Sequence, residues 1–413
     1  MNKYKKVVLA YSGGLDTSVI IPWLKENYNA EVIAFIANVG QPSDDLIGIE
    51  KKALLSGANS AYIVDLREDF VKNYIYPTLH TGAIYEGEYL LGTAIARPII
   101  AKNQVNLALK LGATSVCHGA TGKGNDQIRF ENVYTSLAPQ LKIIAPWREW
   151  NLASRSDLIK YLKQRNISTE ATLQKIYSKD ENIFHTSTEG GILEDINNEP
   201  IKDCWSRTND PIITPNNPRK IHLKIKNGYI HSINKKKYSY VKGLEKLNKI
   251  GSQYGIGRID IVENRLLGIK SRGCYETPGG TIIVKALQAL EQIVLDRESF
   301  KWKKQIGLEM SYVVYDGKWF SPLCQSLIDA VQTFNNVMTG EVTIQLFKGN
   351  INILQKSSPY SLYSKNYASF ETNKLYNHSD AEGFIKIFTL PSKIRALKKN
   401  KIEKSTIKKD NIN

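Results

Sequence analysis

The sequence predicts an α/β fold in which an N-terminal, doubly wound parallel sheet is followed by a second, α+β domain and a basic C-terminal tail. Three observations support this. Short apolar strands alternate with helical stretches up to about residue 165. A glycine turn directly follows the first strand. After residue 211 the pattern changes to polar–apolar alternation around hairpin turns. The expected domains are therefore 1–168 and 169–390, with the tail, partly helical and partly disordered, at 391–413.

The first part alternates strands and helices in chain order. Strands are expected at 7–10, 31–37, 61–64, 114–117 and 142–145, and helices at 17–26, 44–56, 101–111 and 157–165. The strands are almost continuously apolar, which is typical of a parallel sheet covered on both faces. The carboxyl ends of parallel strands meet at one edge, so the loops after Ala10, Ala37 and Cys117 are expected to form one site.

The second part follows a connector rich in proline and asparagine at 211–218. Strands expected at 220–225 and 229–233 flank Asn227-Gly228, a strong hairpin signal. A second hairpin, with strands at 342–347 and 351–354, is expected to turn at 348–350. Helices are expected at 243–253, 284–300 and 322–338. Beyond about residue 400 the chain is charged and poor in apolar residues, which predicts disorder.

Composition indicates a cytoplasmic globular protein with no membrane partner. No run approaches the roughly 18 apolar residues of a membrane span, and the N-terminus enters the first strand without a signal-peptide core. The cysteines are scattered, and the histidines show no ligand spacing, so we expect free thiols and no transition-metal site. These cysteines are Cys117, Cys204, Cys274 and Cys324.

The net charge of +16 raises the question of nucleic-acid binding. Residues 393–413 alone carry eight basic and two acidic side chains, and the remaining basic residues are spread along the chain. The sequence is also rich in Asn, Ile and Tyr, which codons of an A+T-rich genome favour. We therefore expect no nucleic-acid partner.

The glycine turn reads AYSGGLDTS at residues 10–18 and lies between a strand and a helix start. Adjacent glycines, nearby hydroxyl groups and the free N–H groups of the helix's first turn together favour phosphate. A Walker A loop requires a Gly-Lys-Ser/Thr that is absent, and the dinucleotide fingerprint requires three spaced glycines. The remaining candidate resembles the loop of the ATP pyrophosphatases, which cleave ATP to AMP and pyrophosphate.

A second informative segment reads HGATGKGNDQIRFE at residues 118–131. Three glycines in six residues predict a loop and not a core helix. This loop is either an ordinary solvated surface loop or a binding site for a zwitterionic substrate, because it carries both donors and charges of both signs. Lys123 either reaches a phosphate or is solvated.

Longer motifs in the chain resemble those of the argininosuccinate synthase family. The similarity runs in order from about residue 5 to about residue 390. Besides the two segments above it includes YLLGTAIARP (89–98), SLAP (136–139), APWR (145–148), GRIDIVENR (257–265), KSRGCYETP (270–278) and SPYSLY (358–363).

The resemblance implies substrate sites by position. ATP would be bound by Ala10, Tyr11, Ser12, Gly13, Gly14, Leu15, Asp16, Thr17, Ser18, Ala37 and Gly119. Aspartate would be bound by Thr121, Asn125 and Asp126. Citrulline would be bound by Tyr89, Asn125, Arg129, Ser178, Ser187, Glu263 and Tyr275. One departure is Ala94, where some members of the family have a serine that contacts citrulline.

The resemblance also implies the reaction. ATP-dependent ligation of citrulline and aspartate would proceed through citrullyl-AMP to argininosuccinate, AMP and pyrophosphate, with Mg²⁺ as cofactor. Asp16 and Asp126 are the candidate catalytic residues, and Asp16 either orients the metal or caps its helix. The family further implies a synthetase and oligomerisation role for the second domain, a C-terminal arm and a homotetramer. Two alternatives are a tRNA-adenylating relative and a nucleotide sensor without activity.

Overall fold

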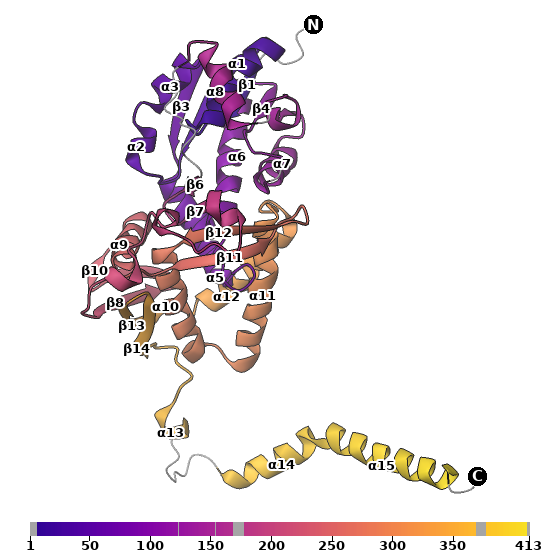
Figure 1. Cartoon of the computed structure of the whole chain (residues 1–413). Coiled ribbons are helices and arrows are strands. Elements are labelled where there is room, and N and C mark those ends of the chain that lie inside the picture. The colour runs from indigo at the N-terminus through magenta and orange to yellow at the C-terminus, as the bar shows by residue number, and fades with distance from the viewer. Residues whose placement is uncertain (1–5, 123, 153, 168–176, 369–376, 411–413) are drawn as a thin grey trace. The chain divides into compact units, whose positions relative to one another are not determined.

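The computed structural model of the chain describes residues 6–122, 124–152, 154–167, 177–368 and 377–410 (Figure 1). The chain divides into two compact units, residues 1–360 and residues 361–413. The expected boundary at 168/169 falls at the edge of a segment outside the described residues. That boundary and the one at 390/391 stay predictions.

A parallel five-stranded sheet forms the first half of the first unit, as predicted. The strand order is β3-β2-β1-β4-β5, so β1 is central. The neighbouring strands β2 and β4 are both parallel to β1. The strands are β1 (Lys6–Ala10), β2 (Glu31–Asn38), β3 (Ser60–Asp65), β4 (Ser115–Cys117) and β5 (Lys142–Ile144).

Helices cover both faces of this sheet. The helices in this part of the chain are α1 (Leu15–Tyr28), α2 (Ser43–Leu46), α3 (Ile49–Leu55), α4 (Arg67–Phe70), α5 (Tyr76–Thr81), α6 (Gly92–Lys110), α7 (Asp126–Leu137) and α8 (Arg155–Lys163). Val7 and Leu9 of β1 pack in one buried cluster with residues of α1 and α3. Val8 packs in another cluster with residues of α6 and α7. The alternation along β1 thus confirms the doubly wound arrangement.

Several helices differ from the predictions. The single helix expected at 44–56 is wrong, because Gly48 adopts a φ of 72° between α2 and α3. Helix α6 begins nine residues before the predicted start, at Gly92. The helical stretch from α4 through a π-helical turn (Val71–Ile75) to α5 was not predicted.

Helix α7 corrects the interpretation of residues 118–131 as a loop throughout. The glycines end at Gly124, and the chain is helical from Asp126 onward. Asp126 lies in the first turn of α7, where a negative charge interacts favourably with the helix dipole. Half of the segment is therefore a loop, and the other half is a partly buried helix.

Two antiparallel sheets form the second half of the first unit. Their strand orders are β10-β9-β8-β13-β14 and β11-β12-β7-β6. Both predicted hairpins, β8–β9 and β13–β14, are confirmed. Strands β6 and β7 were not predicted, because they consist almost entirely of polar residues. The strands are β6 (Tyr177–Glu181), β7 (Thr186–Gly190), β8 (Arg219–Lys226), β9 (Tyr229–Ile233), β10 (Lys236–Lys237), β11 (Arg258–Asn264), β12 (Lys270–Glu276), β13 (Gly340–Phe347) and β14 (Asn350–Ser357).

The helices of this half are α9 (Tyr240–Gln253), α10 (Pro278–Val294), α11 (Arg297–Tyr315) and α12 (Pro322–Asn335). The single helix expected at 284–300 is wrong, because α10 ends at Val294, before Leu295, and α11 begins at Arg297. The side chain of Asp296 accepts a hydrogen bond from the N–H of Ser299 at 2.8 Å and caps α11.

One buried cluster joins the two halves of the first unit. It contains Val8 of the parallel sheet together with Leu223 of β8 and Ile283 of α10. At the junction, the carbonyl of Gly92 accepts a hydrogen bond from the Asn182 side chain at 3.0 Å. The halves therefore share a core, and α6 enters it directly against the β6–β7 turn.

We expect Gly92→Ala to destabilise this junction. A Cβ built on Gly92 would lie 2.0 Å from the Cβ of His185, so α6 or the turn must move. Overpacking of this kind costs about 1–3 kcal/mol of unfolding free energy. The matched control is Gly383→Ala in α14, where a Cβ meets nothing within 4 Å. Thermal unfolding should show a lower Tm for the first variant only; equal Tm values would contradict the packing argument.

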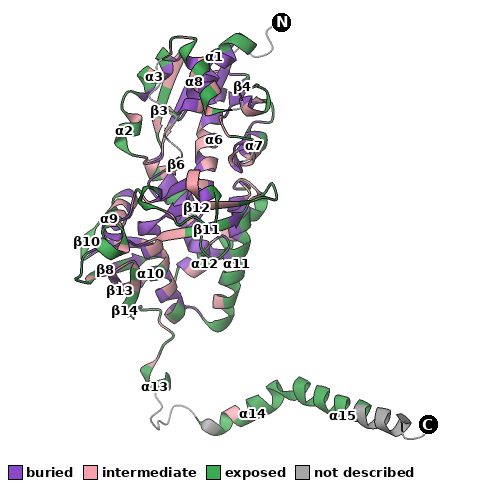
Figure 2. Cartoon of the chain, in the orientation of Figure 1, coloured by how far each residue is buried: buried purple, intermediate pink, exposed green. Residues whose placement is uncertain are grey.

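The second unit consists of α13 (Lys365–Ala368), α14 (His378–Phe388) and α15 (Leu390–Asp410). The expected disorder beyond residue 400 is wrong up to Asp410, because this stretch has good helix formers and neither glycine nor proline. Large apolar side chains of α14 and α15 are exposed, among them Phe384, Ile387 and Phe388 (Figure 2). Among the described residues, none of the helices combines the length and apolar character that crossing a membrane requires.

Candidate active site

The glycine loop lies at the carboxyl end of central strand β1. Gly13 has a φ of 73°, and Gly14 precedes α1 without contributing a side-chain cap. The N–H groups of the first turn of α1 therefore point out of the loop without a capping side chain, as an anion site requires. The hydroxyl of Ser12 lies 3.2 Å from that of Thr17 and accepts from the N–H of Gly14 at 3.3 Å.

The loops after β1, β2 and β4 meet at one edge of the sheet, as expected. Ala37 lies near the end of β2, which pairs with β1. Gly119 follows β4, and a Cβ on it would lie 3.0 Å from the methyl group of Thr17. The strand order reverses between β1 and β4, and such a switch point is where open α/β sheets bind ligands.

Asp16 is the carboxylate of the glycine loop. It lies in the first turn of α1, and its exposure is intermediate. Burial raises the pKa of its carboxyl group, and the charge of Arg155 opposes this. Among the described residues no cluster of three metal-ligating side chains occurs. Lys123 lies outside the described residues.

The residues expected to bind aspartate lead into α7. Thr121 is exposed, and its carbonyl accepts from the N–H of Gly124 at 3.1 Å. Asn125 is 5% exposed, and its side-chain oxygen accepts from the N–H of Leu266 at 3.1 Å. This bond connects the start of α7 to the β11–β12 hairpin. Asp126 follows directly as the first residue of α7.

Asp126 is held by two arginines. Arg97 of α6 donates from Nε to one carboxylate oxygen at 2.9 Å, and Arg129 donates from Nη1 to the other at 3.0 Å. Burial opposes the charge of Asp126, but these two guanidinium groups outweigh it and lower its pKa to about 2. The carboxylate is therefore ionised near neutral pH, and its remaining lone pairs can accept from an ammonium group.

Arg97 also reaches the second half of the unit. Its Nη2 donates to Asp180 of β6 at 2.8 Å, while the same side chain binds Asp126. The Arg97 side chain is 14% exposed. One largely buried guanidinium thus joins α6, α7 and the β11-β12-β7-β6 sheet. Sequence reasoning assigned Arg97 no role, although it lies in the quoted motif 89–98.

Four residues expected to bind citrulline lie on one face of the β11-β12-β7-β6 sheet. Directly opposed residues in antiparallel strands project to the same face. Ser187 of β7 is opposite Tyr275 of β12, and Ser178 is opposite Glu189 two residues further along β7. Glu263 is opposite Ser271 of β12. Ser271 lies four residues before Tyr275, and side chains alternate between the two faces along a strand, so Glu263 belongs to the same face. Ser187, Glu263 and Tyr275 are buried, whereas Ser178 is exposed.

The rings of Tyr89, Tyr275 and Tyr315 form an aromatic wall beside this face. The rings of Tyr89 and Tyr275 are 4.7 Å apart, and Tyr89 is 6.5 Å from Tyr315. Arg129 lies 4.9 Å above the Tyr315 ring and donates from Nε to its carbonyl at 2.9 Å. The structure therefore places Tyr89 and Arg129 around the same aromatic group. Tyr315 was missed in the sequence because nothing local distinguishes it from a packing aromatic. Ala94, the departure from the family, is fully buried in α6.

Several buried polar atoms around this wall have no hydrogen-bond partner among the described residues. They include the hydroxyl of Thr93, while in the described part of the chain Oε2 of Glu263 and the hydroxyl of Tyr315 interact only with each other. Unpaired buried polar atoms cost free energy and are rare in native structures. A polar ligand such as a ureido group would satisfy them. Burial and the charge of Glu189 raise the pKa of Glu263 to about 7, against the opposing effects of Tyr315, Arg129 and Arg265.

We expect Glu263→Gln to change how stability depends on pH. The folded pKa of about 7 lies above the ordinary value of 4.5, so the stability that protonated Glu263 contributes is complete below 4.5 and lost as pH rises through 7. The variant lacks this loss. Its free energy of unfolding relative to the native chain should therefore rise between about pH 5 and about pH 8. Urea titrations at both values test this; a constant difference would contradict it.

Comparisons with known proteins identify the family of this chain. The model of the arginosuccinate synthase N-terminal HUP domain matches residues 6–168, and that of the arginosuccinate synthase C-terminal domain matches residues 177–395. The argininosuccinate synthase of Buchnera aphidicola subsp. Acyrthosiphon pisum (strain Tuc7) is 62% identical over 394 residues, 95% of this chain and 98% of the relative. That of Serratia proteamaculans (strain 568) is 61% identical over 95% of this chain and 97% of the relative.

A solved structure also shows a weak similarity. The U34-tRNA thiolase NcsA from Methanococcus maripaludis covers 41% of this chain and 60% of its own, with 16% identity and a TM-score of 0.27, which is too low to support an argument. The two domain models and the long, highly identical relatives cover nearly all of the chain. The chain belongs to the argininosuccinate synthase family.

Proposed function

We propose that this protein ligates citrulline and aspartate at the expense of ATP, and that argininosuccinate, AMP and pyrophosphate are the products. The observation that carries this proposal is the shared sheet face. Ser178, Ser187, Glu263 and Tyr275 come from distant segments, and the strand register places them on one face beside the aromatic wall. Family membership and the glycine loop support the use of ATP.

In the first step, the ureido oxygen of citrulline attacks the α-phosphorus of ATP and pyrophosphate leaves, which gives citrullyl-AMP. The free N–H groups at the start of α1 and the hydroxyl groups of Ser12 and Thr17 bind the departing pyrophosphate. Mg²⁺, when bound, neutralises phosphate charge, and Asp16 is the carboxylate placed to hold it together with the phosphates. The buried oxygens of Glu263 and Tyr315, which among the described residues interact only with each other, bind and orient the polar part of citrulline.

In the second step, the amine of aspartate attacks the activated carbon and AMP leaves. Asp126 binds the ammonium form of aspartate at the end of the loop that joins the ATP edge to α7. The ammonium group loses one proton to solvent before the free amine attacks. Arg97 and Arg129 keep the carboxylate ionised and oriented. Neither step requires a protein nucleophile. Catalysis comes from holding three substrates in line and from stabilising phosphate charge.

A coupled assay tests the proposal. Full-length protein with ATP, Mg²⁺, citrulline and aspartate should release pyrophosphate and AMP and form argininosuccinate. Formation of ADP and phosphate, or turnover that does not depend on citrulline, would contradict it. Release of pyrophosphate from ATP that depends on tRNA in place of citrulline would favour the tRNA-adenylating alternative. The homotetramer and the cytoplasmic location stay predictions from the family and the composition; sedimentation velocity tests the first.

A further inference from the structure

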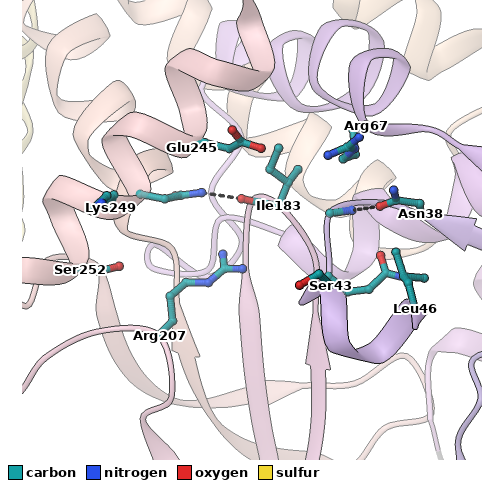
Figure 3. Close-up of a pocket in the computed structure, with 12 residues that line it drawn as sticks. Asn38, Ser43, Leu46, Arg67, Ile183, Arg207, Glu245, Lys249 and Ser252 are labelled. Atoms are coloured by element: carbon teal, nitrogen blue, oxygen red, sulfur yellow. Dashed lines mark hydrogen bonds between the residues drawn. The ribbon is translucent and has the colours of Figure 1, made fainter. Parts of the chain in front are cut away.

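A pocket lies between the loop after β2 and helix α9, and its lining residues are not among the proposed substrate contacts (Figure 3). We call it the β2–α9 pocket, and its volume is about 320 Å³. The polar lining comes from separate segments of the first unit and includes Asn38, Arg67, Arg207, Glu245, Lys249 and Ser252. None of these residues belongs to the ATP, aspartate or citrulline sets above.

Arg207, which lines this pocket, has a side-chain nitrogen without a hydrogen-bond partner among the described residues. Its Nη2 donates to Glu181 at 3.0 Å and to the carbonyl of Asn182, which fixes the guanidinium in place. Its Nη1 is buried and has no partner among the described residues. In Figure 3 the guanidinium lies inside the ring of labelled residues. A buried N–H group without a partner, on a side chain that lines a cavity, points to an acceptor supplied by a ligand.

Two further cations line the pocket. Arg67 is bound on one edge by Asp65 at 2.6 Å, so its guanidinium is also held in position. Lys249, on α9, forms no salt bridge with the described residues. The acidic side chain of the lining, Glu245, pairs with Lys242 at 2.8 Å. The pocket therefore presents guanidinium and ammonium donors together with one carboxylate, Glu245, while Asp65 and Glu181 each occupy part of one guanidinium group.

We propose that the β2–α9 pocket binds an oxyanion, a phosphate or carboxylate group of a small metabolite. Oxygen anions accept charge-assisted hydrogen bonds from guanidinium and ammonium groups held in fixed positions, and the volume suits a small molecule. The pocket shares no lining residue with the glycine loop, although both lie at the carboxyl edge of the parallel sheet.

Calorimetric titration of the full chain with inorganic phosphate tests this, with a non-hydrolysable ATP analogue saturating the glycine loop. We expect phosphate to bind while the analogue is present. Lys249→Gln should weaken it at least about tenfold, because one charge-assisted bond is lost. Lys246→Gln is the matched control, since it removes the same charge from the same helix outside the pocket lining and should leave the affinity unchanged.

A parallel titration with succinate distinguishes the two sources of the anion. Succinate binding that Lys249→Gln weakens identifies a carboxylate ligand, and phosphate binding that Lys249→Gln weakens identifies a phosphorylated one; either result supports the site. The proposal is wrong if neither anion binds, if the ATP analogue removes all phosphate binding, or if Lys249→Gln keeps the native affinity. Because the measurement requires no turnover, its outcome is independent of the proposed function.

Discussion

Asp126→Asn is expected to stop argininosuccinate formation while citrulline adenylation continues. The carboxylate, ionised because its pKa is about 2, is the group that would hold the ammonium of aspartate, and aspartate reacts only after adenylation. Loss of one partner of a largely buried charge pair costs about 3–5 kcal/mol, so kcat/KM for aspartate should fall by about 10²–10³-fold or more. Citrulline-dependent exchange of labelled pyrophosphate into ATP should remain near the native rate.

The choice of asparagine follows from the contacts of Asp126. Alanine would remove both acceptors of Arg97 and Arg129 and endanger folding, whereas an amide oxygen keeps one acceptor. The matched control is Asp180→Asn, which removes the other carboxylate of Arg97 but belongs to none of the expected aspartate contacts. If both variants lose ligation equally, Asp126 acts only by positioning Arg97, and its assigned role in binding aspartate is wrong.

Arg97→Met is expected to destabilise the whole first unit. It leaves Asp126 and Asp180 without their shared cation, at the point where α6 and α7 meet the β11-β12-β7-β6 sheet. Because the Arg97 side chain is only 14% exposed, solvent replaces the lost pairing poorly. We expect the free energy of unfolding in urea to fall by about 3 kcal/mol near neutral pH.

Two variants show whether this loss comes from the bridging geometry. Arg148→Met removes a 47%-exposed guanidinium that pairs with Glu131, and it should cost less than about 1 kcal/mol. Arg97→Lys keeps the charge, but a single ammonium replaces the planar fork that binds two separate carboxylates, so only part of the loss should be recovered. Equal losses in Arg97→Met and Arg148→Met would show that burial of the bridge is unimportant.

Local signals account for the parts of the fold that were predicted correctly. The apolar strands around Val8 and the Asn227-Gly228 turn depend on residues adjacent in sequence. The errors occurred where a local signal was overridden or absent. The break at Leu295 depended on the cap formed by Asp296, and strands β6 and β7 lack the apolar alternation that indicates a strand.

The sequence by itself determined the fold class, the glycine loop and, through long motifs, the family. The tertiary structure alone placed four of the seven expected citrulline residues on one face and joined Asp126 to Asp180 through Arg97. It also produced the β2–α9 pocket. The physical reason is that side chains alternate across a strand, so a face is defined only by the register between strands. That register depends on pairing between segments as distant as 177–190 and 258–276, which no local pattern specifies.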